Sequence, residues 1–146
     1  MISPCNPIMG AVLALSLTGA IASPASAQRS ILFSGALGGV EQHAPEHVSG
    51  HVVALYYPGA HVLRYTVTWG GLSGPVTQVQ LHGPATPGQN APPLITIKGP
   101  YSSPMSGGVM LNAAQAEELA AGKVYMNLQT TAHPDGEARG WLRQEK

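Results

Sequence analysis

Three histidines recur at a fixed spacing in the first half of the chain. They are His43, His47 and His51, arranged as H-x3-H-x3-H with two glutamates nearby. On a helix this spacing would place the three rings on one face, and neutral imidazole is a good ligand for copper and zinc. Pro45 disfavours a continuous helix, because proline removes an amide donor and restricts the residue before it. Two interpretations remain: a loop that binds Cu or Zn weakly, and an ordinary solvated polar loop.

A second group of polar side chains comes from segments that are far apart in the sequence. It comprises Gln80, His82, Asn127, Gln129, His133, Glu137 and Arg139. They would form one cluster if the strands that carry them were neighbours. His82 and His133 are weak candidates for a metal site, because the cluster also holds two glutamines, which are poor ligands for copper or zinc. The alternatives are a patch that binds a small molecule or a glycan, and a buried hydrogen-bond network in which Glu137 pairs with Arg139.

Catalytic constellations are hard to assemble from this sequence. It contains no G-x-S-x-G nucleophile motif, no H-E-x-x-H motif and no phosphate-binding glycine loop. Asp135 and Glu137 flank a turn, where turn chemistry alone explains the aspartate. No pair of titratable groups resembles a tuned acid and base. We therefore expect no enzymatic activity and no cofactor, with bound Cu or Zn as the alternative.

The first part of the chain has the pattern of an export signal. Gly10–Ile21 is an apolar run that is too short to span a bilayer, and Ala25 and Ala27 place small residues where a signal peptidase cuts. The residues before this run depart from the pattern, because they include no Lys or Arg. We expect residues 1–27 to be a signal peptide and residues 28–146 to form one domain, periplasmic or secreted, with no membrane span after cleavage. A retained anchor is the alternative.

Charge and cysteine content narrow the classes of partner. Seven basic and seven acidic residues balance, and charged residues make up only 10% of the chain. The sequence has no basic cluster, which argues against nucleic acid and anionic membranes as partners. The single cysteine, Cys5, lies in the expected leader, so the mature chain can form neither a disulfide nor a thiolate metal site. The expected partner is an extracytoplasmic protein, a glycan or a small ligand.

Most of the mature chain reads as short strands separated by glycine and proline. Alternating apolar residues and turn signals predict strands at Ser30–Leu37, Gly50–Tyr57, His61–Trp69, Val76–His82 and Leu94–Lys98. The second and third of these are expected to form an antiparallel hairpin. A loop is predicted over Gly99–Gly108, and a further short strand is expected to end at Met110–Leu111.

One helix and a closing hairpin follow. Asn112–Ala121 is rich in alanine and begins with a good N-cap, and Gly122 follows its end. Tyr125–Leu142 reads as two strands joined by a three-residue connection at His133–Gly136, where proline, aspartate and glycine suit a type I turn followed by a left-handed residue. This series of short strands indicates an all-β antiparallel sandwich with Greek-key connections and one short helix before the last hairpin.

Three ordered motifs resemble the CHRD domain, which is named for the repeats of chordin and also occurs alone in secreted bacterial proteins. They are LHGPA at Leu81–Ala85, the segment LNAAQAEELAAGKVYMNLQT at Leu111–Thr130, and HPDGEARGWL at His133–Leu142. The resemblance implies an immunoglobulin-like β-sandwich and an extracytoplasmic location, but it implies little about activity. In chordin the domains belong to an extracellular antagonist of growth factors.

The chain departs from the family pattern at two histidine positions. The family commonly has H-x-H-G where this chain has Gln80 before His82, and it commonly has a histidine where this chain has Gln129. The loss of two imidazoles weakens any metal site in the cluster. The leading hypothesis is therefore an exported protein with a non-enzymatic structural or binding role, and the alternative is an extracytoplasmic protein that binds or handles Cu or Zn.

Overall fold

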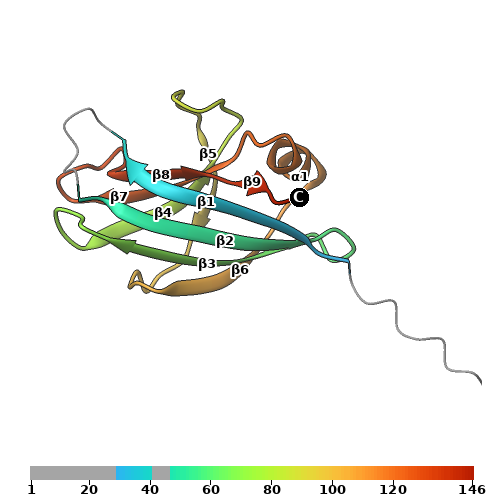
Figure 1. Cartoon of the computed structure of the whole chain (residues 1–146), viewed down its shortest axis with the longest axis horizontal. Coiled ribbons are helices and arrows are strands. Elements are labelled where there is room, and N and C mark those ends of the chain that lie inside the picture. Colours follow the sequence, from blue (N-terminus) through green and yellow to red (C-terminus); the bar gives the residue numbers. More distant parts are fainter. Residues whose placement is uncertain (1–28, 41–46) are drawn as a thin grey trace, which may run out of the picture.

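The computed structural model describes residues 29–40 and 47–146, which fold as antiparallel β-structure with one short helix (Figure 1). The strands are β1 (Ile31–Gly39), β2 (Ser49–Tyr57), β3 (Val62–Gly70), β4 (Val76–His82), β5 (Pro93–Ile97), β6 (Met105–Met110), β7 (Tyr125–Thr130), β8 (Ala138–Trp141) and β9 (Arg143–Gln144). The helix, α1 (Ala113–Ala120), lies between β6 and β7 in the sequence. The predicted all-β class with a single short helix is confirmed.

The strand pairings join the strands into one continuous antiparallel sheet. Its order is β5-β4-β7-β8-β1-β2-β3-β6, and β9 pairs with β1. Two halves of the sheet meet at β1: residues 31–37 pair with β2, whereas Gly38 and Gly39 pair with Arg139 and Ala138 of β8. The sheet curls into a nearly closed, barrel-like shape (Figure 1). The immunoglobulin-like Greek-key sandwich expected from the sequence is not confirmed.

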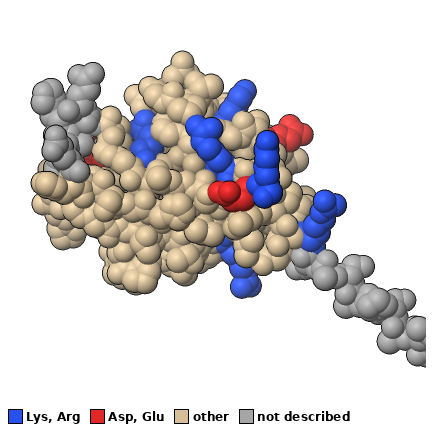
Figure 2. Space-filling model, in the orientation of Figure 1, with Lys and Arg blue, Asp and Glu red and all other residues tan. Residues whose placement is uncertain are grey.

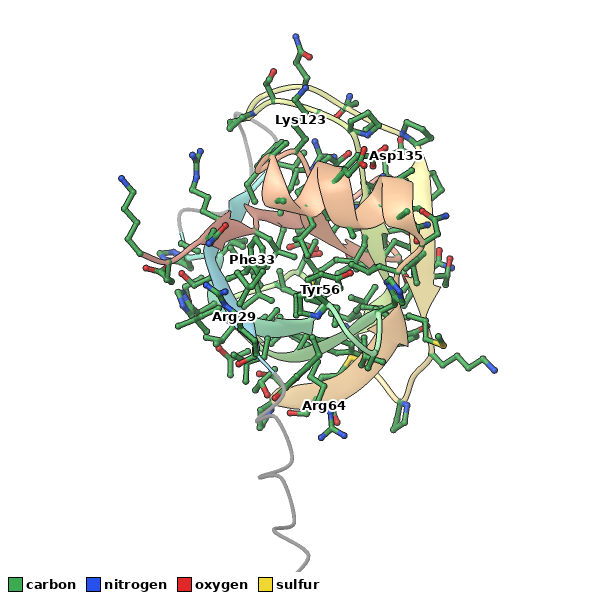
Figure 3. The ribbon with its side chains drawn as sticks, turned by 90° about the vertical axis from the view of Figure 1, so that its right-hand side faces the viewer. Arg29, Phe33, Tyr56, Arg64, Lys123 and Asp135 are labelled. Atoms are coloured by element: carbon green, nitrogen blue, oxygen red, sulfur yellow. The ribbon has the colours of Figure 1, made fainter. Side chains whose placement is uncertain are left out.

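The hydrophobic core fills the inside of the curled sheet. In β3, buried and exposed residues alternate as predicted, because successive side chains of a strand point to opposite faces. Val67, for example, is completely buried. Figure 3 shows Phe33 and Tyr56 directed toward the interior, whereas Arg64 and Lys123 point outward. The apolar alternation in the sequence therefore identifies the inner face of the sheet.

The loop predicted over Gly99–Gly108 is partly wrong. It ends early, because the strand β6 begins at Met105. β6 pairs with β3 and places Gly107 opposite Tyr65. A Cβ at Gly107 would clash with the Tyr65 hydroxyl, so this position requires glycine. Glycine has low strand propensity, which hides the strand in the sequence, and cross-strand contacts outweigh that propensity here.

The closing hairpin forms as predicted, but its connection is longer than three residues. β7 ends at Thr130 and β8 begins at Ala138. Thr130 and His133 exchange two backbone hydrogen bonds, of 3.3 and 3.2 Å, and so close a separate tight turn. The predicted turn at His133–Gly136 follows, with the Gly136 amide donating to the His133 carbonyl at 3.1 Å and a positive φ of 127° at Gly136. The turn residues were identified correctly, and the connection length was wrong.

α1 begins with the N-cap predicted from the sequence, and this residue takes part in a capping box. The Asn112 side chain accepts a hydrogen bond from the Gln115 amide at 2.8 Å, and the Gln115 side chain accepts one from the Asn112 amide at 3.0 Å. Gly122 adopts the expected left-handed conformation after the helix, and Leu119 is buried in the core. No helix among the described residues is long and apolar enough to cross a membrane.

Replacing the N-cap tests this local structure. Asn112→Ala removes one acceptor for the helix amides and should lower the free energy of unfolding by about 1 kcal/mol. Asn112→Asp keeps the acceptor and should preserve stability, since a negative charge suits a helix N-terminus. Urea denaturation followed by circular dichroism measures both changes. Equal loss of stability in the two variants would contradict the capping interpretation.

Candidate functional site

The register of three neighbouring strands gathers the polar residues on the outer face of the sheet. β7 lies between β4 and β8, and it aligns the residues in two rows: His82, Tyr125 and Trp141 in one, and Gln80, Asn127 and Arg139 in the other. Directly opposite residues of antiparallel strands project from the same face. Because the alternate residues of these strands point into the core, both rows project away from it. The structure thus brings together strands that are up to sixty residues apart in the sequence. Four residues of the predicted cluster, Gln80, His82, Asn127 and Arg139, become neighbours in this way.

The connection between β4 and β5, residues 83–92, covers part of this outer face (Figure 1). The Trp141 indole donates to the Ala85 carbonyl at 3.0 Å, and the Ala91 amide donates to the Tyr125 hydroxyl at 3.1 Å. Tyr125 is therefore completely buried although it faces away from the core. Sequence reasoning missed Tyr125 and Trp141 as parts of the site. Their alternation with Asn127 and Arg139 was the signal that could have found them.

His82 is fixed on both sides of its ring. Its Nδ1 lies 2.8 Å from the Ala91 carbonyl oxygen, its Nε2 lies 3.2 Å from Oε1 of Gln80, and the ring stacks on Tyr125 at 5.1 Å between centroids. Burial lowers the pKa of His82, and the positive charge of Arg139 lowers it further, although the contact with Ala91 opposes them. Near neutral pH the imidazole is therefore largely uncharged, so it donates through one nitrogen only, to either the Ala91 carbonyl or Oε1 of Gln80.

Glutamine and asparagine side chains extend this network. Gln129 donates to Oε1 of Gln80 at 3.0 Å, and Gln80 donates to the Thr96 hydroxyl at 2.9 Å. Asn127 is completely buried and donates to the Asp135 carbonyl at 3.2 Å, while its Oδ1 has no hydrogen-bond partner. This part of the cluster matches the predicted buried hydrogen-bond network.

Arg139 is held over the aromatic row. Its guanidinium carbon lies 4.3 Å from the centroid of Tyr125 and 5.9 Å from that of Trp141. Its Nη1 donates to Oδ1 of Asn90 at 2.7 Å, whereas its Nε is buried without a hydrogen-bond partner. Cation–π contacts and one hydrogen bond therefore fix the position of the guanidinium and leave donors unused.

An open groove of about 740 Å³ lies beside Arg139. Its lining includes Tyr125, Trp141, Asn90 and Asp135, together with the end of β1 at Gly38. Gly38 lies directly opposite Arg139 in the β1–β8 pairing, and a Cβ there would meet no atom within 4 Å. The absence of a side chain at this position keeps the space beside the guanidinium open.

Glu137 lies outside the groove and is almost completely buried. It accepts hydrogen bonds from the Ser73 amide at 2.6 Å, the Ser73 hydroxyl at 2.7 Å and the Thr130 hydroxyl at 2.6 Å. The predicted pairing of Glu137 with Arg139 is therefore wrong. Glu137 precedes the first residue of β8, so its side chain reaches the β3–β4 connection rather than the groove. It ties that connection to the closing hairpin.

The same hydrogen bonds control the ionisation of Glu137. Burial alone would raise the pKa of its carboxyl group, but the hydrogen bonds from Thr130 and Ser73, together with the nearby His133, hold the pKa below its ordinary value of 4.5. A carboxyl whose pKa falls on folding stabilises the folded state above its ordinary pKa. That contribution is lost as the pH falls through the lower pKa of the folded protein.

Removing the charge of Glu137 should therefore destabilise the fold in a pH-dependent way. Glu137→Gln should lower the free energy of unfolding by about 2–4 kcal/mol at pH 7, because hydrogen-bond donors are left facing an amide. The difference from the unmodified protein should shrink as the pH falls below the ordinary carboxyl pKa. Urea denaturation from pH 7 to pH 3 measures it, with the exposed Glu117→Gln as the matched control. A difference that does not change with pH would contradict this role.

The predicted metal ligands do not gather in the described part of the chain. His43 lies outside the described residues, so the H-x3-H-x3-H segment as a whole cannot be placed. His47 and His51 are exposed, and His51 lies within β2. Among the residues that are described, no three His, Cys, Asp or Glu side chains form a group that could hold a metal ion. His82 and His133 therefore do not form the centre of such a group.

Comparison with known proteins identifies one similarity. A family model for the CHRD domain matches residues 33–142. No curated protein and no solved structure matches the chain. The matched region extends from β1 to the end of the closing hairpin, so it contains the entire outer face described above.

Proposed function

The chain belongs to the CHRD domain family, and from this premise we propose that it is an exported binding protein without enzymatic activity. Its ligand site is the groove beside Arg139. The observation that carries this proposal is the position of the guanidinium, which the stack on Tyr125 and the hydrogen bond to Asn90 fix at the edge of an open space. A group that is already in place loses little freedom when a ligand binds.

The chemistry of the lining supports binding rather than catalysis. The lining contains no serine, threonine, cysteine or lysine among the described residues, so it offers no hydroxyl, thiol or amine nucleophile from these residue types. His82 is the one imidazole among the described lining residues, and each of its nitrogens lies against an oxygen of the protein. A general acid or base needs a proton position that is open to the substrate. Since protein oxygens already contact both nitrogens of His82, this residue is also poorly placed to bind Cu or Zn as a resident cofactor.

The surface charge supports a small ligand rather than a polyanion. Figure 2 shows few charged side chains on the face turned to the viewer, with Lys and Arg scattered and Asp and Glu beside some of them. A nucleic acid would require a continuous basic surface to neutralise its phosphates. The groove volume of about 740 Å³ falls within the range of sites for small molecules.

Filling the groove tests its role in binding. Gly38→Trp should project an indole into the open space, because Gly38 faces the same side as Arg139 and does not have a positive φ. In 15N NMR spectra recorded with a library of small acids, sugars and their amides, ligands should shift the Asn90, Ala91 and Arg139 amide signals. These shifts should be absent in Gly38→Trp.

Gly59→Trp provides the matched control. Gly59 lies in the β2–β3 connection, and a Cβ there also meets no atom within 4 Å. This variant should keep the ligand-induced shifts of the unmodified protein. Shifts that persist in Gly38→Trp, or that cluster away from the groove, would contradict the proposed site.

Export is tested at the predicted cleavage site. The protein recovered from the periplasm or medium of an expressing bacterium should begin at Gln28, as measured by N-terminal sequencing and intact mass. Ala27→Asp should block cleavage, whereas Ala27→Gly should preserve it, because signal peptidases need a small residue there. Recovery of the uncleaved chain from the membrane fraction would instead support a retained anchor.

A further inference from the structure

We propose that the groove recognises the carboxylate of a small cyclic organic acid, which binds the guanidinium of Arg139. This inference rests on the proposed function and specifies its ligand class. Arg139 is the only lysine or arginine among the described lining residues, so it supplies the positive charge of the groove. The three observations that follow concern its unused donors, the neighbouring charges and the shape of the space.

Arg139 has hydrogen-bonding capacity that the protein does not use. A guanidinium has five N–H donors, and the hydrogen bond to Asn90 occupies one of them. The Nε is buried and has no partner. Because the Nε is buried, the donors that a ligand can reach are those of the two Nη atoms, of which Asn90 occupies one. The side chain therefore presents a charge and free donors at the edge of the groove.

No protein carboxylate neutralises this charge within the described residues. Asp135 lines the same groove, but it forms no ion pair with Arg139, and Glu137 is committed to Ser73 and Thr130. Asn90, which does contact the guanidinium, is uncharged. Because no carboxylate forms an ion pair with it, the guanidinium remains available to an anionic ligand.

The number of charges favours a carboxylate over a phosphate. One guanidinium supplies a single positive charge, and it matches the two oxygens of a carboxylate in a planar, bidentate arrangement. The carboxylate of Asp135 at the groove would repel a dianion more strongly than a monoanion. The phosphate-binding features of other proteins, a second cation or a helix N-terminus, do not occur in the described lining.

The remainder of the groove favours a ring on the ligand. Trp141 lies partly exposed in the lining, tilted at 41° against Tyr125 with 4.7 Å between the ring centroids. Gly38 leaves space beside the guanidinium, because a Cβ there would meet no atom within 4 Å. A flat ring can contact the indole while its carboxylate meets Arg139. Both aromatic and sugar rings stack on indole, so benzoate and galacturonate are the two probes.

Calorimetric titration of the full mature chain tests this proposal. Each acid is compared with its neutral amide, benzamide or galacturonamide, and inorganic phosphate serves as the anion without a planar carboxylate. At least one of the two carboxylates should bind about tenfold or more tightly than its amide, as expected for charge-assisted hydrogen bonds. That preference should disappear in Arg139→Gln. Phosphate should bind more weakly than the better carboxylate.

An isosteric variant neutralises the positive charge of Arg139 while keeping this residue in place. Asn90→Asp places a carboxylate 2.7 Å from Nη1, at an exposed loop position where the fold should be unaffected. The new ion pair should weaken binding of the carboxylate about tenfold and leave binding of the amide unchanged. Gln89→Glu adds the same charge at the neighbouring exposed position, where no hydrogen bond to the guanidinium is present, and should weaken carboxylate binding much less than Asn90→Asp does.

The outcomes separate this inference from the proposed function. If neutral molecules bind in a manner that Gly38→Trp abolishes, while the acids bind no better than their amides, the carboxylate inference fails and the binding groove stands. If acids bind but Asn90→Asp has no effect, the acids are not held by Arg139 and the inference also fails. If no acid, sugar or amide binds at concentrations up to about 10 mM, both the inference and the proposed function are overturned.

Discussion

The alignment of β7 between β4 and β8 is the constraint on which the outer face depends. A strand has a side-chain period of two residues, so a shift of one residue in either pairing would turn Tyr125 and Asn127 into the core and expose Met126 and Leu128. Burial of the apolar set therefore determines the register, and the register in turn determines which polar residues become neighbours. The position of Arg139 beside Tyr125 is a consequence of core packing elsewhere in the same strands.

Two different uses of polar residues follow from that alignment. Glu137 is buried with three donors around its carboxylate, and it joins the β3–β4 connection to the hairpin. Arg139, two residues later, has a single hydrogen bond and borders an open groove. The motif that contains both residues therefore serves two purposes, since one charge is satisfied within the fold and the other is left available at its surface.

Local patterns were sufficient to predict much of the fold. Alternation identified β3 and β4 nearly to the residue, and cap and turn chemistry located α1 and the turn at Gly136. These features depend on contacts between residues that are close in the sequence. The start of β6 was predicted too late, because Gly107 lies against Tyr65, a residue some forty positions away, and no local pattern reports such a contact.

The site was harder to predict than the fold, for a related reason. The sequence indicated that Gln80, His82, Asn127 and Gln129 share a face, but it could not indicate that residues 83–92 fold back over that face. That connection has no periodicity, so nothing in it predicts its path. The error with Glu137 and Arg139 had the same origin, because the rule that residues two apart share a face applies only within a strand, and β8 begins between them.

The groove lies beside the pairing that joins the two halves of the sheet. β1 meets β8 at only two paired positions, Gly38 with Arg139 and Gly39 with Ala138, whereas it meets β2 along most of its length. The groove lies directly over this short seam. A molecule bound between Gly38 and Arg139 would contact both strands of this seam, so its binding would stabilise their pairing.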